Sequence, residues 1–228
     1  MLRAFALLAL AGSARGLAAG PTQRSARQAA RELAAVGSCV QRAGESVIGA
    51  AGAVGDSLFQ PNSLSLAGLS LARAGRDLDD AGSAGRMGDG ILGEVVTMRL
   101  IDVAASLGAA AQNWPTLCDG EPVGSVTLCD GLASASAEME VACRALQSKK
   151  LAAAGASLAG AGRGLTASAD ALAELRPISS ASCAQGLSTA AQLLADGGEK
   201  LGKIGGYFSG DGAGPATKPA SRWAPPVP

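Results

Sequence analysis

A seven-residue rhythm of leucine, alanine and glycine constrains this chain more than any other feature. Between Leu64 and Ala81 a leucine recurs every seven residues, an alanine follows each leucine by three positions, and a glycine follows by four. The residues of this seam are Leu64, Leu71 and Leu78, Ala67, Ala74 and Ala81, and Gly68, Gly75 and Gly82. In a heptad written abcdefg they fall at positions a, d and e. The pattern therefore predicts an α-helix that buries one large and two very small side chains in every two turns.

The same rhythm recurs along most of the chain. The expected helices cover residues 25–59, 63–84, 89–111, 130–148, 151–175 and about 178–205. The fifth of them repeats the seam with Leu151, Leu158, Gly162 and Leu165. Short connections favour antiparallel neighbours, so the sequence predicts an all-α, up-and-down bundle of about six helices.

Glycine in phase with a seam indicates unusually close helix packing. A glycine within a helix costs about 1 kcal/mol relative to alanine. Its repetition at one heptad position suggests that close approach of the backbones offsets this cost. A GC-rich coding sequence that places alanine and glycine wherever they are tolerated is the alternative explanation.

Two segments depart from the rhythm. Residues 89–111 are apolar around nearly the whole helical circumference, which is typical of a centrally buried helix or of one that faces a partner. At Lys149 and Lys150 the leucine phase slips, because Leu146 and Leu151 are five residues apart rather than seven. The slip predicts a turn or a kink there and leaves open whether the fourth and fifth helices are continuous.

The chain reads as one domain, residues 22–207, between a leader and a tail. Residues 1–19 have one early arginine, a short apolar stretch and small residues near their end, as in a secretory signal peptide. The arginine-rich, acid-poor N-terminus also fits a transit peptide, which leaves the thylakoid lumen of a plastid, or a mitochondrion, as alternatives. The glycine- and proline-rich residues 208–228 predict a disordered tail. Leu151 lies 87 residues after Leu64, and halves at about 25–111 and 126–205 suggest an internal duplication.

Composition narrows the classes of partner. The 19 basic and 19 acidic residues give a formal net charge of zero and form no basic stripe, which argues against nucleic-acid binding. Aromatic residues make up only 3 % of the chain. No stretch is apolar for long enough to predict a transmembrane span, although membrane association stays open. Low charge favours burial against a protein partner or a second copy of the chain.

Five cysteines behind a secretory leader predict disulfide bonds with at least one thiol left over. The candidates are Cys39, Cys118, Cys129, Cys143 and Cys183. In an up-and-down bundle Cys118, Cys129 and Cys183 fall near one pole, so we expect one bridge within this trio. A bridge between Cys39 and Cys143 is the second expectation. Cys129 and Cys143 lie 14 residues apart, about 21 Å in a continuous helix, and cannot pair there.

The sequence offers no recognisable catalytic apparatus. The chain contains no histidine, which removes the commonest general base and the mixed cysteine–histidine zinc sites. The acidic residues between Asp77 and Glu94 do not follow the EF-hand spacing. We therefore expect no enzyme, no cofactor and no metal site.

One cysteine spacing resembles that of a known family. Cys143 and Cys183 lie 40 residues apart, with Ser180-Ala181-Ser182 before the second. This resembles the later cysteine pair of the plant invertase and pectin methylesterase inhibitors, which are secreted four-helix bundles. The family's closely spaced early pair is missing here, as are the aromatic and acidic residues around its third cysteine.

The function expected from these features is non-catalytic. The first hypothesis is a secreted or lumenal, disulfide-stapled helical bundle that serves as a structural or interaction protein and binds a protein partner. The alternatives are an accessory subunit of an organellar membrane complex, a lipid or pigment carrier, and a secreted enzyme inhibitor of the four-helix type.

Overall fold

The computed structural model describes residues 23–54, 62–83, 90–117, 125–174 and 178–209. Residues 1–22, 55–61, 84–89, 118–124, 175–177 and 210–228 lie outside the described residues. Six α-helices and no strand make up the described part of the chain. They are α1 (Gln23–Ala53), α2 (Ser63–Ser83), α3 (Gly90–Leu117), α4 (Ser125–Gln147), α5 (Leu151–Ala173) and α6 (Ile178–Ser209). The expected all-α architecture is thereby confirmed.

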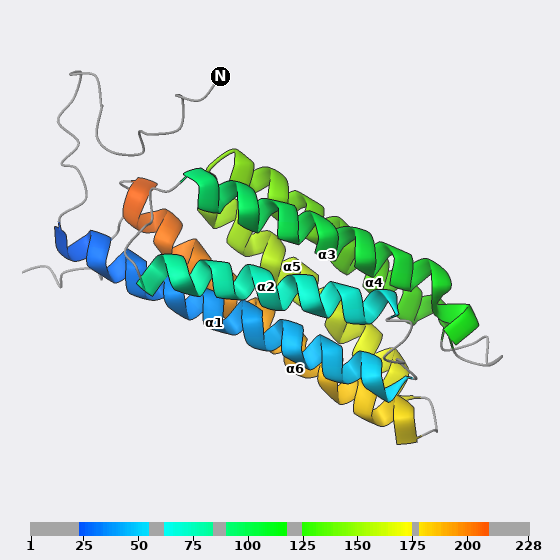
Figure 1. Ribbon diagram of the computed structural model, residues 1–228. Coiled ribbons are helices and arrows are strands. Elements are labelled where there is room, and N and C mark those ends of the chain that lie inside the picture. The colour runs from blue at the N-terminus through cyan, green and yellow to red at the C-terminus, as the bar shows by residue number, and fades with distance from the viewer. Residues whose placement is uncertain (1–22, 55–61, 84–89, 118–124, 175–177, 210–228) are drawn as a thin grey trace, which may run out of the picture.

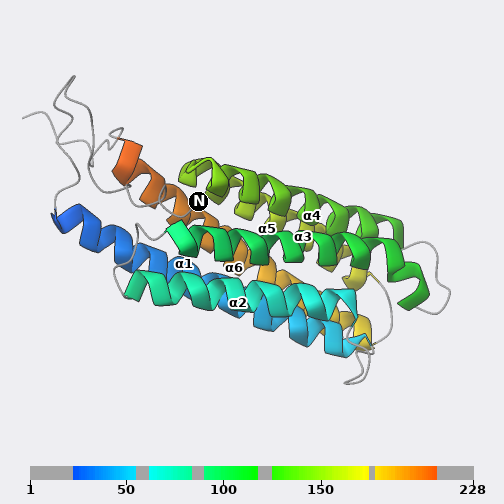
Figure 2. The ribbon, with the colours of Figure 1, turned by 45° about the horizontal axis from the view of Figure 1, so that its top comes forward.

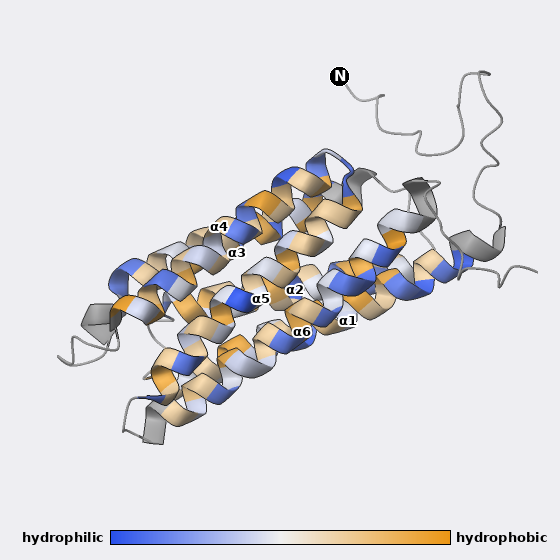
Figure 3. Ribbon diagram, turned by 180° about the vertical axis from the view of Figure 1, so that it is seen from behind, coloured by the Kyte–Doolittle hydropathy of each residue, from blue (hydrophilic) through white to orange (hydrophobic). Residues whose placement is uncertain are grey.

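The six helices form a closed ring. Each described helix contacts the helices before and after it in the chain, and α6 returns to contact α1. No pair across the ring, such as α1 with α4 or α4 with α6, comes within backbone contact distance in the described ranges. The two views of Figures 1 and 2 show the six helices lying roughly side by side along one direction. Hydrophobic and hydrophilic residues alternate around every ribbon rather than gathering at one end (Figure 3).

The glycines at position e bring backbones into direct contact within the α1–α2 pair. A Cβ atom added to Gly44 would lie 2.6 Å from the carbonyl oxygen of Gly68, and one added to Gly37 would lie 2.6 Å from that of Gly75. Real Cβ atoms essentially never approach so closely. These positions run in opposite directions along the two helices, so α1 and α2 are antiparallel.

Glycine also mediates other helix contacts in the ring. In the α5–α6 pair, a Cβ on Gly162 would lie 2.6 Å from the carbonyl oxygen of Ala191. In the α4–α5 pair, Gly131 and Gly164 face each other, and a Cβ on either would lie 2.7 Å from the other's carbonyl oxygen. Loss of the side chain therefore allows these helices to approach more closely than larger residues would permit.

The contact between α2 and α3 is the least extensive in the ring. The glycines Gly68, Gly75 and Gly82 of α2 meet α1 instead, and Gly108 of α3 meets Ser136 of α4. Asp77 and Arg99 approach each other there with Oδ2 and Nε 4.0 Å apart. Neither of these buried atoms has a hydrogen-bond partner.

Leucines, one methionine and one tryptophan from α2 to α6 fill the core, and α1 contributes smaller side chains such as Val36, Val40 and Val47. The largest fully buried side chains are Trp114, Leu64, Leu71, Leu107, Leu128, Leu132, Met139, Leu158, Leu165, Leu172, Leu187 and Leu194. Most of them occupy position a of their heptads. The apolar seam predicted from the sequence thus points to the centre of the ring.

The helices expected at 89–111 and 130–148 are longer than the sequence suggested, because α3 continues to Leu117 and α4 already begins at Ser125. Trp114 is 1 % exposed and Leu128 is fully buried. Burial of these two large side chains in the core outweighs the weak helix propensity of their neighbours.

The apolar helix α3 does not lie at the centre of the bundle. It contacts α2 on one side and α4 on the other, as every helix of the ring contacts its two neighbours. Its Met98 and Ile101 are exposed. The apolar circumference of α3 therefore includes an outward face, which corrects the expectation of central burial.

The phase slip between the fourth and fifth helices is a turn. Lys149 adopts a left-handed backbone conformation, with φ of 58°. The Lys149 amide donates to the carbonyl oxygen of Leu146 at 2.9 Å, and the Lys150 amide donates to that of Ala145 at 2.8 Å. This is the Schellman arrangement, which glycine usually provides. A lysine in the glycine position explains why no glycine marks the turn that the phase slip predicts.

Candidate functional site

Large exposed hydrophobic side chains are confined to one side of the ring. Among the described residues they are Leu66, Leu69, Met98, Ile101, Val126 and Val141. The first two belong to α2, the next two to α3 and the last two to α4, which are three consecutive helices of the ring. We call this set the α2–α4 face. The described parts of α1, α5 and α6 expose no comparable residue.

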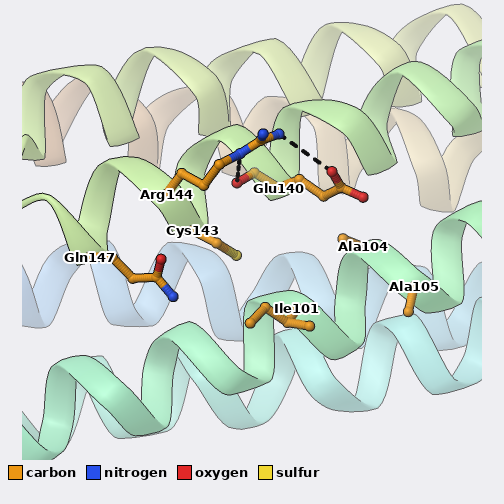
Figure 4. Close-up of a pocket in the computed structure, with 7 residues that line it drawn as sticks. All are labelled: Ile101, Ala104, Ala105, Glu140, Cys143, Arg144 and Gln147. Atoms are coloured by element: carbon orange, nitrogen blue, oxygen red, sulfur yellow. Dashed lines mark hydrogen bonds and ion pairs between the residues drawn. The ribbon is translucent and has the colours of Figure 1, made fainter.

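A groove of about 420 Å³ runs between α3 and α4 within this face. Ile101, Ala104 and Ala105 of α3 line one side. Residues Glu140, Cys143, Arg144 and Gln147 of α4 line the other. Figure 4 shows the two sets of side chains projecting from facing helices.

Polar side chains at position e join the two walls of the groove. The Ser136 hydroxyl donates to the carbonyl oxygen of Ala104 at 2.7 Å. The Cys143 thiol donates to the carbonyl oxygen of Thr97, with 3.8 Å between sulfur and oxygen. In the α3–α4 pair, side chains thus occupy heptad position e, which glycines occupy in the α1–α2 pair.

The Cys143 thiol is poorly suited to act as a nucleophile. Burial raises the pKa of this thiol from 9.0 to about 11. The thiol therefore stays protonated at neutral pH, whereas the reactive form of cysteine is the thiolate. The chain has no histidine that could accept its proton.

The charged side chains of the groove lie at its outer rim. Arg144 Nη2 lies 3.4 Å from Glu140 Oε2, with the side chains 69 % and 62 % exposed. The Arg144 Nε group also donates to the backbone carbonyl oxygen of Glu140 at 3.4 Å. Exposed pairs of this kind add little to stability, so both side chains can turn towards another molecule.

The seam residues singled out in the sequence lie inside the ring. Leu64, Leu71, Leu158 and Leu165 are buried, as are Ala67, Ala74, Gly68, Gly75 and Gly162, whereas Leu78 and Leu151 are half-buried. Gly75 meets the backbone of Gln41 on α1, and Gly162 meets that of Ala191 on α6. The structure therefore places these residues in the packing of the bundle and not in the groove.

The cysteines do not support a disulfide-assisted bundle. No disulfide bond joins any of the four described cysteines, and Cys118 lies outside the described residues. Cys39 on α1 cannot reach Cys143 on α4, because these helices are not neighbours in the ring. Cys183 on α6 is separated from both Cys129 and Cys143 on α4 for the same reason. The expected pairings among described cysteines are therefore wrong.

Sequence reasoning missed the groove itself. The signal that the sequence contained was a pair of apolar residues on α3, Met98 and Ile101, together with an acidic and a basic residue four positions apart on α4. The structure shows that the two apolar residues are exposed and that the two charged residues form an ion pair. The pattern did not show which sides of α3 and α4 would face each other. That pairing depends on the closure of the ring.

Two further properties bear on the site. Within the described ranges, no three histidine, cysteine, aspartate or glutamate residues come together as ligands for a metal ion. None of the described helices combines the length and the apolar content required to cross a membrane.

Comparison of the chain with protein-family models, with curated proteins and with solved structures finds no match in any of the three.

Proposed function

We propose that this protein is a non-catalytic interaction module that binds a protein partner through its α2–α4 face. The observation that carries the proposal is the confinement of every large exposed hydrophobic side chain in the described residues to three consecutive helices. Met98 is 66 % exposed and Val126 is 63 % exposed. Exposed apolar surface beyond scattered single residues marks interaction sites on folded proteins, which supports this use of the three neighbouring helices.

The chemistry of the groove supports binding rather than catalysis. Its thiol is protonated at neutral pH, and its ion pair lies at the solvent-exposed rim. Apolar side chains surrounded by charged ones are the usual composition of a protein–protein interface. The remainder of the bundle holds this face rigid through its packed helix contacts.

We further propose that the mature protein acts in a secretory or lumenal compartment, with a plastid or a mitochondrion as alternatives. The composition of residues 1–19 supports this proposal, and these residues lie outside the described ones. N-terminal sequencing of the protein isolated from its source will define the mature start. A mature protein that still begins at Met1 would contradict the assignment.

The binding proposal is tested by placing charge on the α2–α4 face. A Met98→Glu, Ile101→Glu variant introduces two carboxylates into its centre. The matched control is Ala153→Glu, Ala156→Glu, which has the same spacing and lies on the exposed side of α5. Parent and variants are immobilised and exposed to extract from the source cells.

We expect a component that the parent and the α5 control retain and that the α2–α4 variant loses. Circular dichroism and melting temperature establish that all three proteins fold alike. Equal retention by the parent and the α2–α4 variant would place the interaction elsewhere and contradict the proposal.

A further inference from the structure

The exposed charges of α4 follow a strict order along the helix. The acidic residues Asp130, Glu138 and Glu140 all precede the basic residues Arg144, Lys149 and Lys150, which extend into the following turn. All but the half-buried Glu138 are exposed. In α5 the order is reversed, since Arg163 precedes Asp170 and Glu174. In α6 the order is the same as on α4, since Asp196 and Glu199 precede Lys200 and Lys203. The described part of α6 exposes no large hydrophobic side chain, so separated charges coincide with an exposed apolar residue on α4 and not on α6.

A helix with this order of charges is complementary to an antiparallel copy of itself. In an antiparallel pair the acidic half of each helix faces the basic half of the other, whereas a parallel pair would oppose like charges. Glu140 and Arg144 are equidistant from Ala142. A two-fold axis that crosses the exposed surface of α4 at the height of this buried residue places Glu140 of each copy opposite Arg144 of the other. Such an isologous contact uses the same patch on both subunits.

Apolar side chains occupy the middle of the same surface. Val141 is 43 % exposed and lies on α4 between Glu140 and Arg144. Ile101 is 47 % exposed and lines the adjacent groove with Ala105. An apolar centre with charged residues around it matches the anatomy of protein–protein interfaces.

Two features reduce the cost of bringing two copies together. The Glu140–Arg144 pair within one chain is solvent-exposed at 3.4 Å, so little stability is lost when the two side chains exchange partners. The formal net charge of the chain is zero, so two copies have no net charge repulsion to overcome.

We propose that a second copy of this chain covers α4, in a two-fold dimer with antiparallel α4 helices and reciprocal Glu140–Arg144 ion pairs. The inference rests on the proposed function, because it identifies the partner of part of the α2–α4 face. The charge order also suits the dipole of a single helix, and the experiment below separates the two roles.

The test uses two variants of the full chain that carry opposite charges at the axis. Glu140→Arg leaves two positive side chains near the axis on each copy, and Arg144→Glu leaves two negative ones on each copy. Sedimentation equilibrium gives the dimer dissociation constant of each protein alone and of an equimolar mixture. The double variant Glu140→Arg, Arg144→Glu reverses both charges and completes the set.

We expect the parent to dimerise and each single variant to dimerise at least about tenfold more weakly, because like charges then face each other. The mixture should form a heterodimer with affinity close to that of the parent, and the double variant should dimerise again. A role confined to the helix dipole would give no rescue in the mixture. Circular dichroism of each variant verifies that α4 still folds.

A monomeric parent at all concentrations would overturn the proposal, as would single variants that dimerise like the parent or a mixture without a heterodimer. These failures are distinguishable from failure of the proposed function. If Met98→Glu, Ile101→Glu still abolishes binding of a cellular component, the interaction face stands without the dimer.

Discussion

The α1–α2 and α3–α4 pairs use the same heptad position for opposite purposes. In α1–α2, glycines at position e bring backbone against backbone, as where Gly44 meets Gly68. In α3–α4, Ser136 and Cys143 occupy position e and donate to carbonyl oxygens across the contact. The first pair packs backbone against backbone at these positions, and the second borders a groove of about 420 Å³. The size of the residue at position e thus distinguishes a contact in which the two backbones meet from a contact that borders a groove.

The comparison also separates stability from recognition. The described part of α1 exposes no large hydrophobic side chain, whereas α3 exposes Met98 and Ile101. Tight packing uses the apolar residues of α1 inside the ring, and α3 keeps some of its apolar residues outside. We therefore expect substitutions at the α1–α2 contact to affect mainly folding, and substitutions on the outer surface of the α2–α4 face to affect mainly binding.

The largest effect is expected from filling the α1–α2 contact. Gly75→Leu should reduce the free energy of unfolding by about 3 kcal/mol, at the upper end for an overpacked site. The cause is the Gly75 Cα, which faces the backbone of both Gln41 and Gly37 on α1. Chemical denaturation of parent and variant measures the change.

Gly49→Leu is the matched control for this experiment. A Cβ atom on Gly49 would have no neighbour within 4 Å, and the residue is exposed on α1. Because leucine is a better helix former than glycine, this variant should be as stable as the parent or more stable by up to about 1 kcal/mol. A Gly75→Leu variant as stable as Gly49→Leu would show that the α1–α2 helices are not in backbone contact.

We expect the Cys143 thiol to have an intermediate effect on the stability of the fold, and this effect depends on pH. Burial raises its pKa to about 11 from 9.0. The buried thiol contributes its full stabilisation of the folded state below pH 9, where the thiol is protonated in both the folded and the unfolded chain. It is lost between pH 9 and 11, because the unfolded chain then releases the proton more readily. The loss has an upper limit of about 2.7 kcal/mol.

The measurement compares how the stability of the parent and of Cys143→Ala changes with pH. Other groups titrate in the same range, so the difference between the two pH dependences isolates this thiol. The parent should lose stability more steeply than Cys143→Ala between pH 9 and 11. Parallel profiles would mean that the Cys143 thiol is not shielded from water at the α3–α4 contact.

The smallest effect is expected from the hydroxyl group that bridges α3 and α4. Ser136→Ala removes its 2.7 Å hydrogen bond to the Ala104 carbonyl oxygen and should reduce stability by about 1 kcal/mol. Ser134→Ala on the exposed side of α4 is the control and should change stability little. Equal melting temperatures for the two variants would show that water replaces this hydrogen bond.

Much of the fold was predictable because helical periodicity is a local property. The a and d positions of the seam, such as Leu71 and Ala74, are buried as a repeating apolar stripe requires. Helix ends were less predictable, because burial of Trp114 and Leu128 extends α3 and α4 beyond their local signals. The turn at Lys149 was predicted from the phase slip alone, although no glycine marks it.

The candidate site was much less predictable. Ile101 and Cys143 are 42 residues apart in the sequence and line one groove. The disulfide prediction failed for the same reason, since the heptad places a cysteine on a helix without specifying that helix's neighbours. Cys39 and Cys143 lie on helices that face different neighbours in the ring.

By itself the sequence determined the helices, the inward side of those that carry the seam, and the seam glycines at which backbones meet. These properties follow from a repeat read over a few turns, because side chains three and four residues apart share one face of a helix. Only the tertiary structure decided that the helices close into a ring, that α3 has an outward apolar surface, and that a groove separates α3 from α4. Ring closure depends on contacts between distant segments, which the repeat within any one helix does not encode.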